Sequence, residues 1–104
     1  MNLSIDVKEG NEKISVMLAG EIDAFTAPSL REELLPLAEG YNKTMVVNLK
    51  DVSYLDSTGL GVFVGLFKKL KEDGGELRLI ELSDRLKRLF EITGLGNLMN
   101  ISGN

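Results

Sequence analysis

The apolar residues of this chain switch repeatedly between the two-residue spacing of a strand and the three-to-four-residue spacing of a helix. Alternating apolar positions over residues 3–23 predict two strands joined by a turn at Gly10 and Asn11. The later segments predict helix 26–40, strand 44–49, helix 59–75, strand 76–82, helix 83–96 and a short edge strand over 97–102. Helices that alternate with strands indicate an α/β fold with parallel strand pairs after an antiparallel opening.

Local signals mark where the expected helices begin and end. Thr26 and Ser83 are candidate N-caps, and Gly94 is a candidate stop for the last helix. Pro36 removes a backbone donor, so we expect a kink or an early last turn near the end of the first helix. In helix 59–75 the residues predicted to face the core follow helical spacing: Leu60, Phe63, Val64, Phe67 and Leu70.

Composition and charge exclude several functions. The 104 residues include no Cys and no His, which excludes disulfides, thiolate or histidine zinc sites and Ser-His-Asp catalysis. The net charge of -4 offers no cationic surface for the phosphates of a nucleic acid. No apolar stretch approaches the ~18 residues of a membrane span, and the first ten residues lack the features of a signal peptide. We therefore expect a soluble, cytoplasmic, single-domain protein with no direct nucleic-acid or membrane partner.

The stretch DSTG, residues 56–59, stands between a strand pattern and a helix pattern. Because parallel strands share one carboxyl edge, the loops GEIDAFT (20–26) and KDVSYLDSTG (50–59) should be neighbours. This placement brings together four polar residues: Asp23, Asp56, Ser57 and Thr58. The first turn of a helix favours an anion, but this turn contains no Lys or Arg, so a covalent phosphate is favoured over a freely bound one.

Other interpretations of this region stay open. Asp56 or Ser57 is equally explained as a simple N-cap, with Gly59 only allowing a tight turn. Along the following helix, a face roughly opposite the expected core combines small and apolar residues: Gly61, Val62, Gly65 and Leu66. Mid-helix glycine costs ~1 kcal/mol against alanine. That cost indicates that something approaches the helix backbone closely at these glycines, either a partner protein or a second helix of the same domain.

Known catalytic and nucleotide-binding patterns do not fit. GLGVFVG has Val64 where the dinucleotide motif requires its third glycine, and no P-loop sequence occurs. DSTG carries one residue too many for an aspartic protease turn. Glu21, Asp23 and Asp56 offer oxygen ligands for Mg²⁺ with a nucleotide, but carboxylates this scattered are weak evidence. We therefore expect neither catalysis nor a bound cofactor or metal.

Three stretches together resemble one known family: GEIDAFTAPSLREELLPLAEG, LKDVSYLDSTGLGVFVG and GGELRLIELSDRLKRLFEITGL. They are similar to the STAS-domain anti-sigma factor antagonists, most of all to the general-stress type, over nearly the whole chain. The resemblance implies a single STAS domain over residues 1–104. It also implies a four- to five-stranded mixed sheet with helices packed mainly on one face.

For function, the resemblance implies a partner switch. In such families the unphosphorylated protein binds an anti-sigma factor that is also a serine kinase and so releases the sigma factor. Phosphorylation, here of Ser57, ends that binding, and a metal-dependent phosphatase of the PP2C type resets the switch. The residues expected to contact the partner are Asp23, Asp56, Ser57, Thr58, Gly59, Gly61, Val62, Gly65 and Leu66. The alternative functions are a STAS scaffold subunit or a nucleotide-binding STAS domain, and we expect a monomer when no partner is bound.

Overall fold

A computed structural model describes residues 2–103. The elements, in chain order, are β1 (Leu3–Glu9), β2 (Lys13–Ile22), α1 (Ala27–Ala38), β3 (Thr44–Leu55), α2 (Ser57–Glu72), β4 (Glu76–Leu82), α3 (Asp84–Ile92), the short 3₁₀ helix η1 (Leu95–Asn97) and β5 (Asn100–Gly103). This order confirms the predicted alternation of strands and helices. No helix in the described part of the chain is long and apolar enough to cross a membrane.

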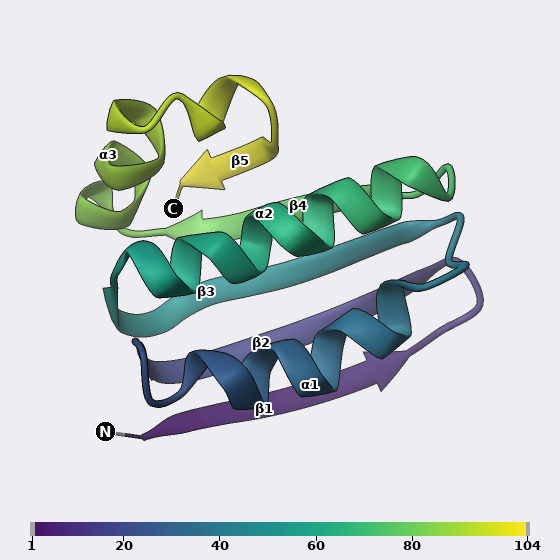
Figure 1. Cartoon of the computed structure of the whole chain (residues 1–104), viewed down its shortest axis with the longest axis horizontal. Coiled ribbons are helices and arrows are strands. Elements are labelled where there is room, and N and C mark those ends of the chain that lie inside the picture. The colour runs from purple at the N-terminus through teal and green to yellow at the C-terminus, as the bar shows by residue number, and fades with distance from the viewer. Residues whose placement is uncertain (1, 104) are drawn as a thin grey trace.

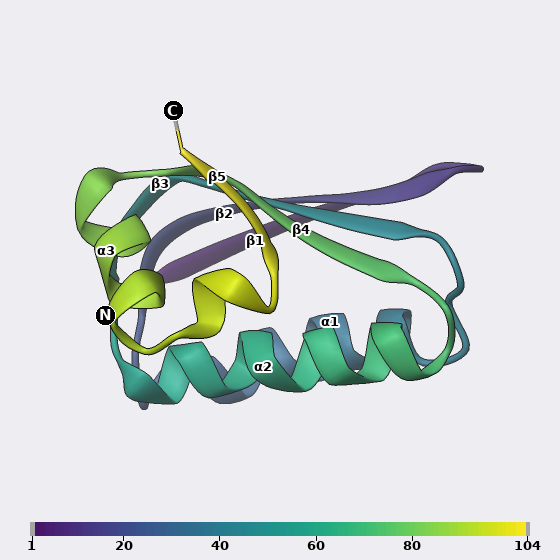
Figure 2. The ribbon, with the colours of Figure 1, turned by 90° about the horizontal axis from the view of Figure 1, so that it is seen from above.

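The strands form one five-stranded sheet in the order β1-β2-β3-β4-β5 (Figure 1). β1 pairs antiparallel with β2, and every later pair is parallel. Seen from above, α1 and α2 lie on the same face of this sheet (Figure 2), and they run beside each other along it (Figure 1). The predicted fold class, an α/β mixed sheet with its helices mainly on one face, is therefore confirmed.

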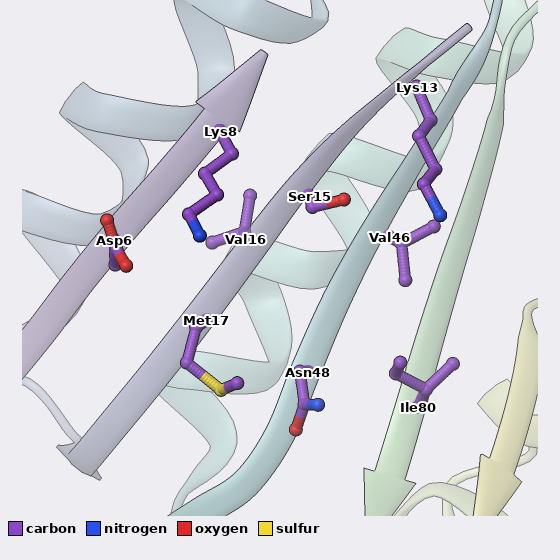
Figure 3. A pocket seen from close by; sticks show the side chains of 9 residues that line it. All are labelled: Asp6, Lys8, Lys13, Ser15, Val16, Met17, Val46, Asn48 and Ile80. Carbon is purple, nitrogen blue, oxygen red and sulfur yellow. The ribbon is translucent and has the colours of Figure 1, made fainter. Parts of the chain in front are cut away.

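The two faces of the sheet differ in what they bury. Alternate strand residues such as Leu18, Val47 and Leu79 point toward the helices and are fully buried, at 0% exposed. On the helix-free face the strands form a shallow hollow (Figure 3). Its lining mixes apolar and polar side chains: Asp6, Lys8, Lys13, Ser15, Val16, Met17, Val46, Asn48 and Ile80.

The buried face of α2 is wider than the sequence pattern indicated. Leu60, Phe63 and Leu70 are buried as predicted, whereas Val64 and Phe67 are only partly covered. Val62 and Leu66 are 2% and 1% exposed, so the prediction that they lie on an outward, partner-facing side is wrong. The physical reason is that α2 packs against α1 as well as against the sheet, which buries two sides of the helix (Figure 1).

β3 is longer than predicted, because residues 50–55 continue the strand that was expected to end at residue 49. Residues 50–55 were assigned to the following loop, but Val52 and Leu55 are buried in the continued strand while Lys50 and Asp51 face solvent. Two register shifts in the β2–β3 pairing, between Met17 and Ala19 and between Gly20 and Glu21, accompany this extension. The turn before α2 is consequently reduced to a single residue.

The helix ends largely follow the predicted signals. Thr26 occupies the N-cap position of α1, but its side chain makes no capping hydrogen bond. α1 continues through Pro36 for two further residues and ends at Ala38. At α3, the Ser83 hydroxyl accepts a hydrogen bond of 3.3 Å from the Leu86 N–H, as expected of an N-cap. Gly94 follows α3 with a φ of 79°, a conformation that favours glycine.

Candidate functional site at the carboxyl edge

The carboxyl ends of β2 and β3 lie side by side, as the topology predicted. Ile22 is opposite Leu55 in the parallel pairing, and Glu21 is opposite Tyr54. The Asp56 N–H donates a hydrogen bond of 3.2 Å to the Ile22 carbonyl oxygen, which extends the pairing into the turn. The loop that follows β2 is thereby held next to the start of α2.

Asp56 is the N-cap of α2. Its Oδ1 atom accepts hydrogen bonds from the Thr58 N–H at 3.0 Å and from the Gly59 N–H at 3.1 Å. The simple capping interpretation of Asp56 is thus confirmed. Ser57 is the first residue of the helix, and both Ser57 and Thr58 are exposed to solvent. The cap therefore presents the Ser57 hydroxyl at the surface without enclosing it.

Gly59 is buried where α2 approaches β2 and β3. A Cβ atom at this position would lie 2.4 Å from Leu55 Cδ1 and 2.6 Å from Ile22 Cγ2. Such distances are too short for non-bonded carbon atoms, so only glycine fits without displacing the side chains of Leu55 and Ile22. The role of Gly59 is to let the Ser57 turn lie directly against the ends of the two strands.

Asp23 organises the loop between β2 and α1. Its Oδ1 atom accepts hydrogen bonds from the backbone N–H groups of Phe25 (2.9 Å) and Thr26 (3.1 Å). Thr26 Oγ1 donates to the Glu21 carbonyl oxygen at 2.8 Å. Asp23 is 5% exposed, and its Oδ2 atom is buried without a hydrogen-bond partner among the described residues.

A hollow at this edge joins the two loops that the sequence placed together. Its lining comes from both: Glu21, Asp23, Ala24, Phe25, Tyr54 and Asp56. Within the described residues, no group of three or more acidic side chains is arranged to hold a metal ion. We call this the acidic hollow; its chemistry is that of hydrogen-bond acceptors beside two aromatic rings.

Two of its lining residues were not singled out from the sequence. Phe25 is 81% exposed and Tyr54 is 45% exposed, large values for aromatic side chains. Both fall outside every apolar stripe of helical or strand spacing. The sequence could have indicated their exposure, because each is an aromatic residue that lies outside the predicted core positions and close to a polar turn.

Gly61 and Gly65 lie on the outer side of α2. Both are exposed, and a Cβ atom added at either position would have no neighbour within 4 Å. Close approach by another helix of this domain therefore does not explain them. They leave a patch of bare backbone one to two turns after Ser57.

The chain belongs to the STAS-domain family, whose model matches residues 3–104. Among curated relatives, the anti-sigma-B factor antagonist of Bacillus subtilis is 57% identical over 102 residues, covering 98% of this chain and 93% of the relative. The anti-sigma-B factor antagonist of Listeria monocytogenes is 52% identical over 104 residues, covering 97% of this chain and 90% of the relative.

Solved structures share the fold. An anti-sigma factor antagonist from Mycobacterium paratuberculosis superposes with a TM-score of 0.86 at 23% identity, covering 99% of this chain and 87% of that one. The phosphorylated form of the Bacillus cell fate determinant SpoIIAA superposes with a TM-score of 0.75 at 24% identity, covering 94% and 90%. At these identities the likeness concerns the fold alone.

Proposed function

We propose that this chain is an anti-sigma factor antagonist that works by binding rather than by catalysis. In its unphosphorylated form it binds, in the cytoplasm, an anti-sigma factor with serine kinase activity, and so releases the sigma factor. Phosphorylation of Ser57 ends the binding, and a PP2C-type phosphatase restores it. The observation that carries the proposal is the exposed Ser57 hydroxyl at the capped start of α2, in a chain 57% identical to an anti-sigma-B factor antagonist.

The electrostatics of the turn support a switch of this kind. A phosphate on Ser57 adds about -1.5 to -2 charges next to the Asp56 carboxylate. Asp56 already accepts the hydrogen bonds of the Thr58 and Gly59 N–H groups, so these donors are not free to neutralise the phosphate. The added charge therefore remains at the surface, where it repels an acidic partner and obstructs close contact.

The partner surface includes the exposed residues around Ser57. Thr58, Gly61 and Gly65 lie on the outer side of α2, and the acidic hollow beside them adds the half-buried Asp56 and the largely buried Asp23. Bare backbone at the two glycines allows a partner to approach α2 closely. Gly59, Val62 and Leu66 support this surface from inside and do not contact the partner.

The test is a phosphorylation and binding assay with the purified chain, ATP and the candidate anti-sigma kinase. Fragment mass spectrometry should place the phosphate on Ser57, and the phosphorylated chain should lose the kinase complex. Ser57→Ala should bind without accepting phosphate, Ser57→Asp should bind poorly, and Thr58→Ala is the matched control that still accepts phosphate. Equal affinity of Ser57→Ala and Ser57→Asp would refute the switch.

A further inference from the structure

A second hollow lies at the same edge, between the end of β3 and α3. It is lined by Tyr54, Leu55, Arg85, Leu86, Arg88, Leu89 and Ile92, and we call it the α3 groove. Tyr54 also lines the acidic hollow, so the two hollows adjoin at this residue. The surface around Ser57 therefore extends from the β2–α1 loop across β3 to the last helix.

Exposed apolar side chains concentrate on this edge. The described residues include five large exposed apolar side chains, and three of them line the two hollows: Phe25 (81%), Tyr54 (45%) and Ile92 (75%). Ile92 ends α3 and points away from the stripe that buries Leu86 and Phe90. Apolar side chains gathered on one part of a surface are typical of an interaction site.

The charges on the two sides of Tyr54 are opposite in sign. Glu21, Asp23 and Asp56 line the acidic hollow, whereas Arg85 and Arg88 line the α3 groove. Neither arginine makes an ion pair with another residue in the part of the chain that is described. In a chain of net charge -4, this groove is locally cationic and keeps both guanidinium groups available.

We propose that the α3 groove docks a segment of the anti-sigma partner that combines an apolar side chain with flanking carboxylates. This inference rests on the proposed function, because it extends the Ser57 surface onto α3. The apolar side chain would pack against Leu89 and Ile92, and its carboxylates would receive hydrogen bonds from Arg85 and Arg88. Opposite charges on either side of Tyr54 also fix the orientation in which the partner binds.

The test measures affinity for the anti-sigma kinase with two pairs of variants. Arg88→Glu is matched by Lys87→Glu, which changes the net charge equally on the same helix but lies beside Gly103 of β5. Ile92→Gln is matched by Leu98→Gln, which removes another exposed apolar side chain, one that lines a different hollow beside Phe67 and Lys71. Thermal unfolding of all four variants establishes that each is folded.

We expect Arg88→Glu and Ile92→Gln each to weaken binding at least tenfold, and both controls to stay within about twofold of the wild type. The effect of Arg88→Glu should shrink at high salt, whereas that of Ile92→Gln should persist. Equal weakening of binding by Arg88→Glu and Lys87→Glu would refute docking in the α3 groove, since the change in net charge alone would explain the loss of affinity. Wild-type binding by Ile92→Gln would overturn it as well.

The failure of this inference is distinguishable from failure of the proposed function. If Ser57→Asp loses the kinase complex while both groove variants bind like the wild type, the switch stands and the α3 groove is refuted. Size-exclusion chromatography of the chain alone tests whether a second copy of the chain occupies the α3 groove instead. A dimer that Ile92→Gln dissociates would also refute docking of the anti-sigma partner.

Discussion

The Asp56 N–H lies 3.2 Å from the Ile22 carbonyl oxygen and donates a hydrogen bond to it, so the turn before α2 is attached to the end of a neighbouring strand. The Asp56 side chain simultaneously caps the helix through the Thr58 and Gly59 N–H groups. One residue thus fixes the turn to the sheet by its backbone and to α2 by its carboxylate. Ser57 is held in a defined position although nothing covers it.

Removing the cap at Asp56 should weaken the domain and loosen this turn. Asp56→Ala deprives two N–H groups of their acceptor, and we expect a loss of about 1 kcal/mol in the free energy of unfolding. Asp56→Asn retains a capping oxygen and should lose only a few tenths of that amount. Urea unfolding of the three proteins checks this, and equal losses for both variants would show that charge, not capping, is what Asp56 supplies.

Adding one methyl group at Gly59 should be strongly destabilising. The Cβ of Gly59→Ala would overlap Leu55 Cδ1 and Ile22 Cγ2, and relieving such overlap in a packed core costs about 1–3 kcal/mol. The measurement is the denaturant midpoint of the variant against the wild type. A variant as stable as the wild type would show that α2 shifts freely against β2 and β3.

The exposed glycines of α2 should respond in the opposite direction. Gly61→Ala and Gly65→Ala add a methyl group to open space inside a helix, and each should stabilise the domain by about 1 kcal/mol. A bulky residue at the same place, as in Gly65→Leu, should leave the domain folded but weaken kinase binding. Unchanged affinity for Gly65→Leu, measured beside Lys68→Leu as an exposed control on the same helix, would remove this face from the partner surface.

Asp23 should contribute to stability independently of any partner. Asp23→Ala removes the acceptor of two backbone hydrogen bonds in the β2–α1 loop, and we expect a loss of about 1–3 kcal/mol. Weaker partner binding by this variant would therefore be ambiguous. Asp23→Asn keeps an Oδ1 acceptor while replacing the buried, unpartnered Oδ2, so its affinity reports on the partner more directly. Unfolding and binding measured on both variants separate the two contributions.

The hydrogen bond between Asn100 and Glu76 predicts a pH dependence at the β4–β5 pair. Asn100 Nδ2 donates a hydrogen bond of 3.0 Å to Glu76 Oε2, and this bond is the main reason that the pKa of Glu76 lies below its ordinary value of 4.5. Arg78 lowers the same pKa further. Asn100→Ala should therefore raise the pKa of Glu76, which an NMR titration of the side chain measures.

The sign of the stability effect follows from that direction. A carboxylate with a lowered pKa contributes stability above pH 4.5, and this contribution is lost as the pH falls through the folded-state pKa. Asn100→Ala should be less stable than the wild type at neutral pH, and the difference should narrow in acid. Asn42→Ala, at another exposed asparagine, is the control; a difference that widens in acid would contradict the assignment.

The sequence predicted most of the fold because its apolar spacing is regular. Val16 and Leu18 in β2, or Leu86 and Phe90 in α3, occupy positions of strand or helix period and are buried accordingly. The apolar spacing did not predict burial correctly where a helix packs against two different neighbours. Val62 belongs to no single stripe, because one side of α2 packs on the sheet and another on α1, so its burial depends on tertiary arrangement.

The candidate site was predicted less completely. Parallel topology correctly placed the Asp23 loop beside Asp56, because that inference needs only the strand order. The extra length of β3 and the exposure of Tyr54 were missed, since residues 50–55 mix polar with apolar residues and so have the composition of a loop. Ile92 was missed because only the structure shows which side of α3 remains uncovered.

The order of strands in the sheet is also their order along the chain. During synthesis each strand therefore emerges next to the strand with which it pairs, and no pairing waits for a distant segment to be made. The elements from β1 to α2, residues 3–72, contain the complete Ser57 turn, and α3 follows them. The Ser57 turn is therefore synthesised before the last helix, and pairing in chain order limits the time in which an unpaired strand edge is open to aggregation.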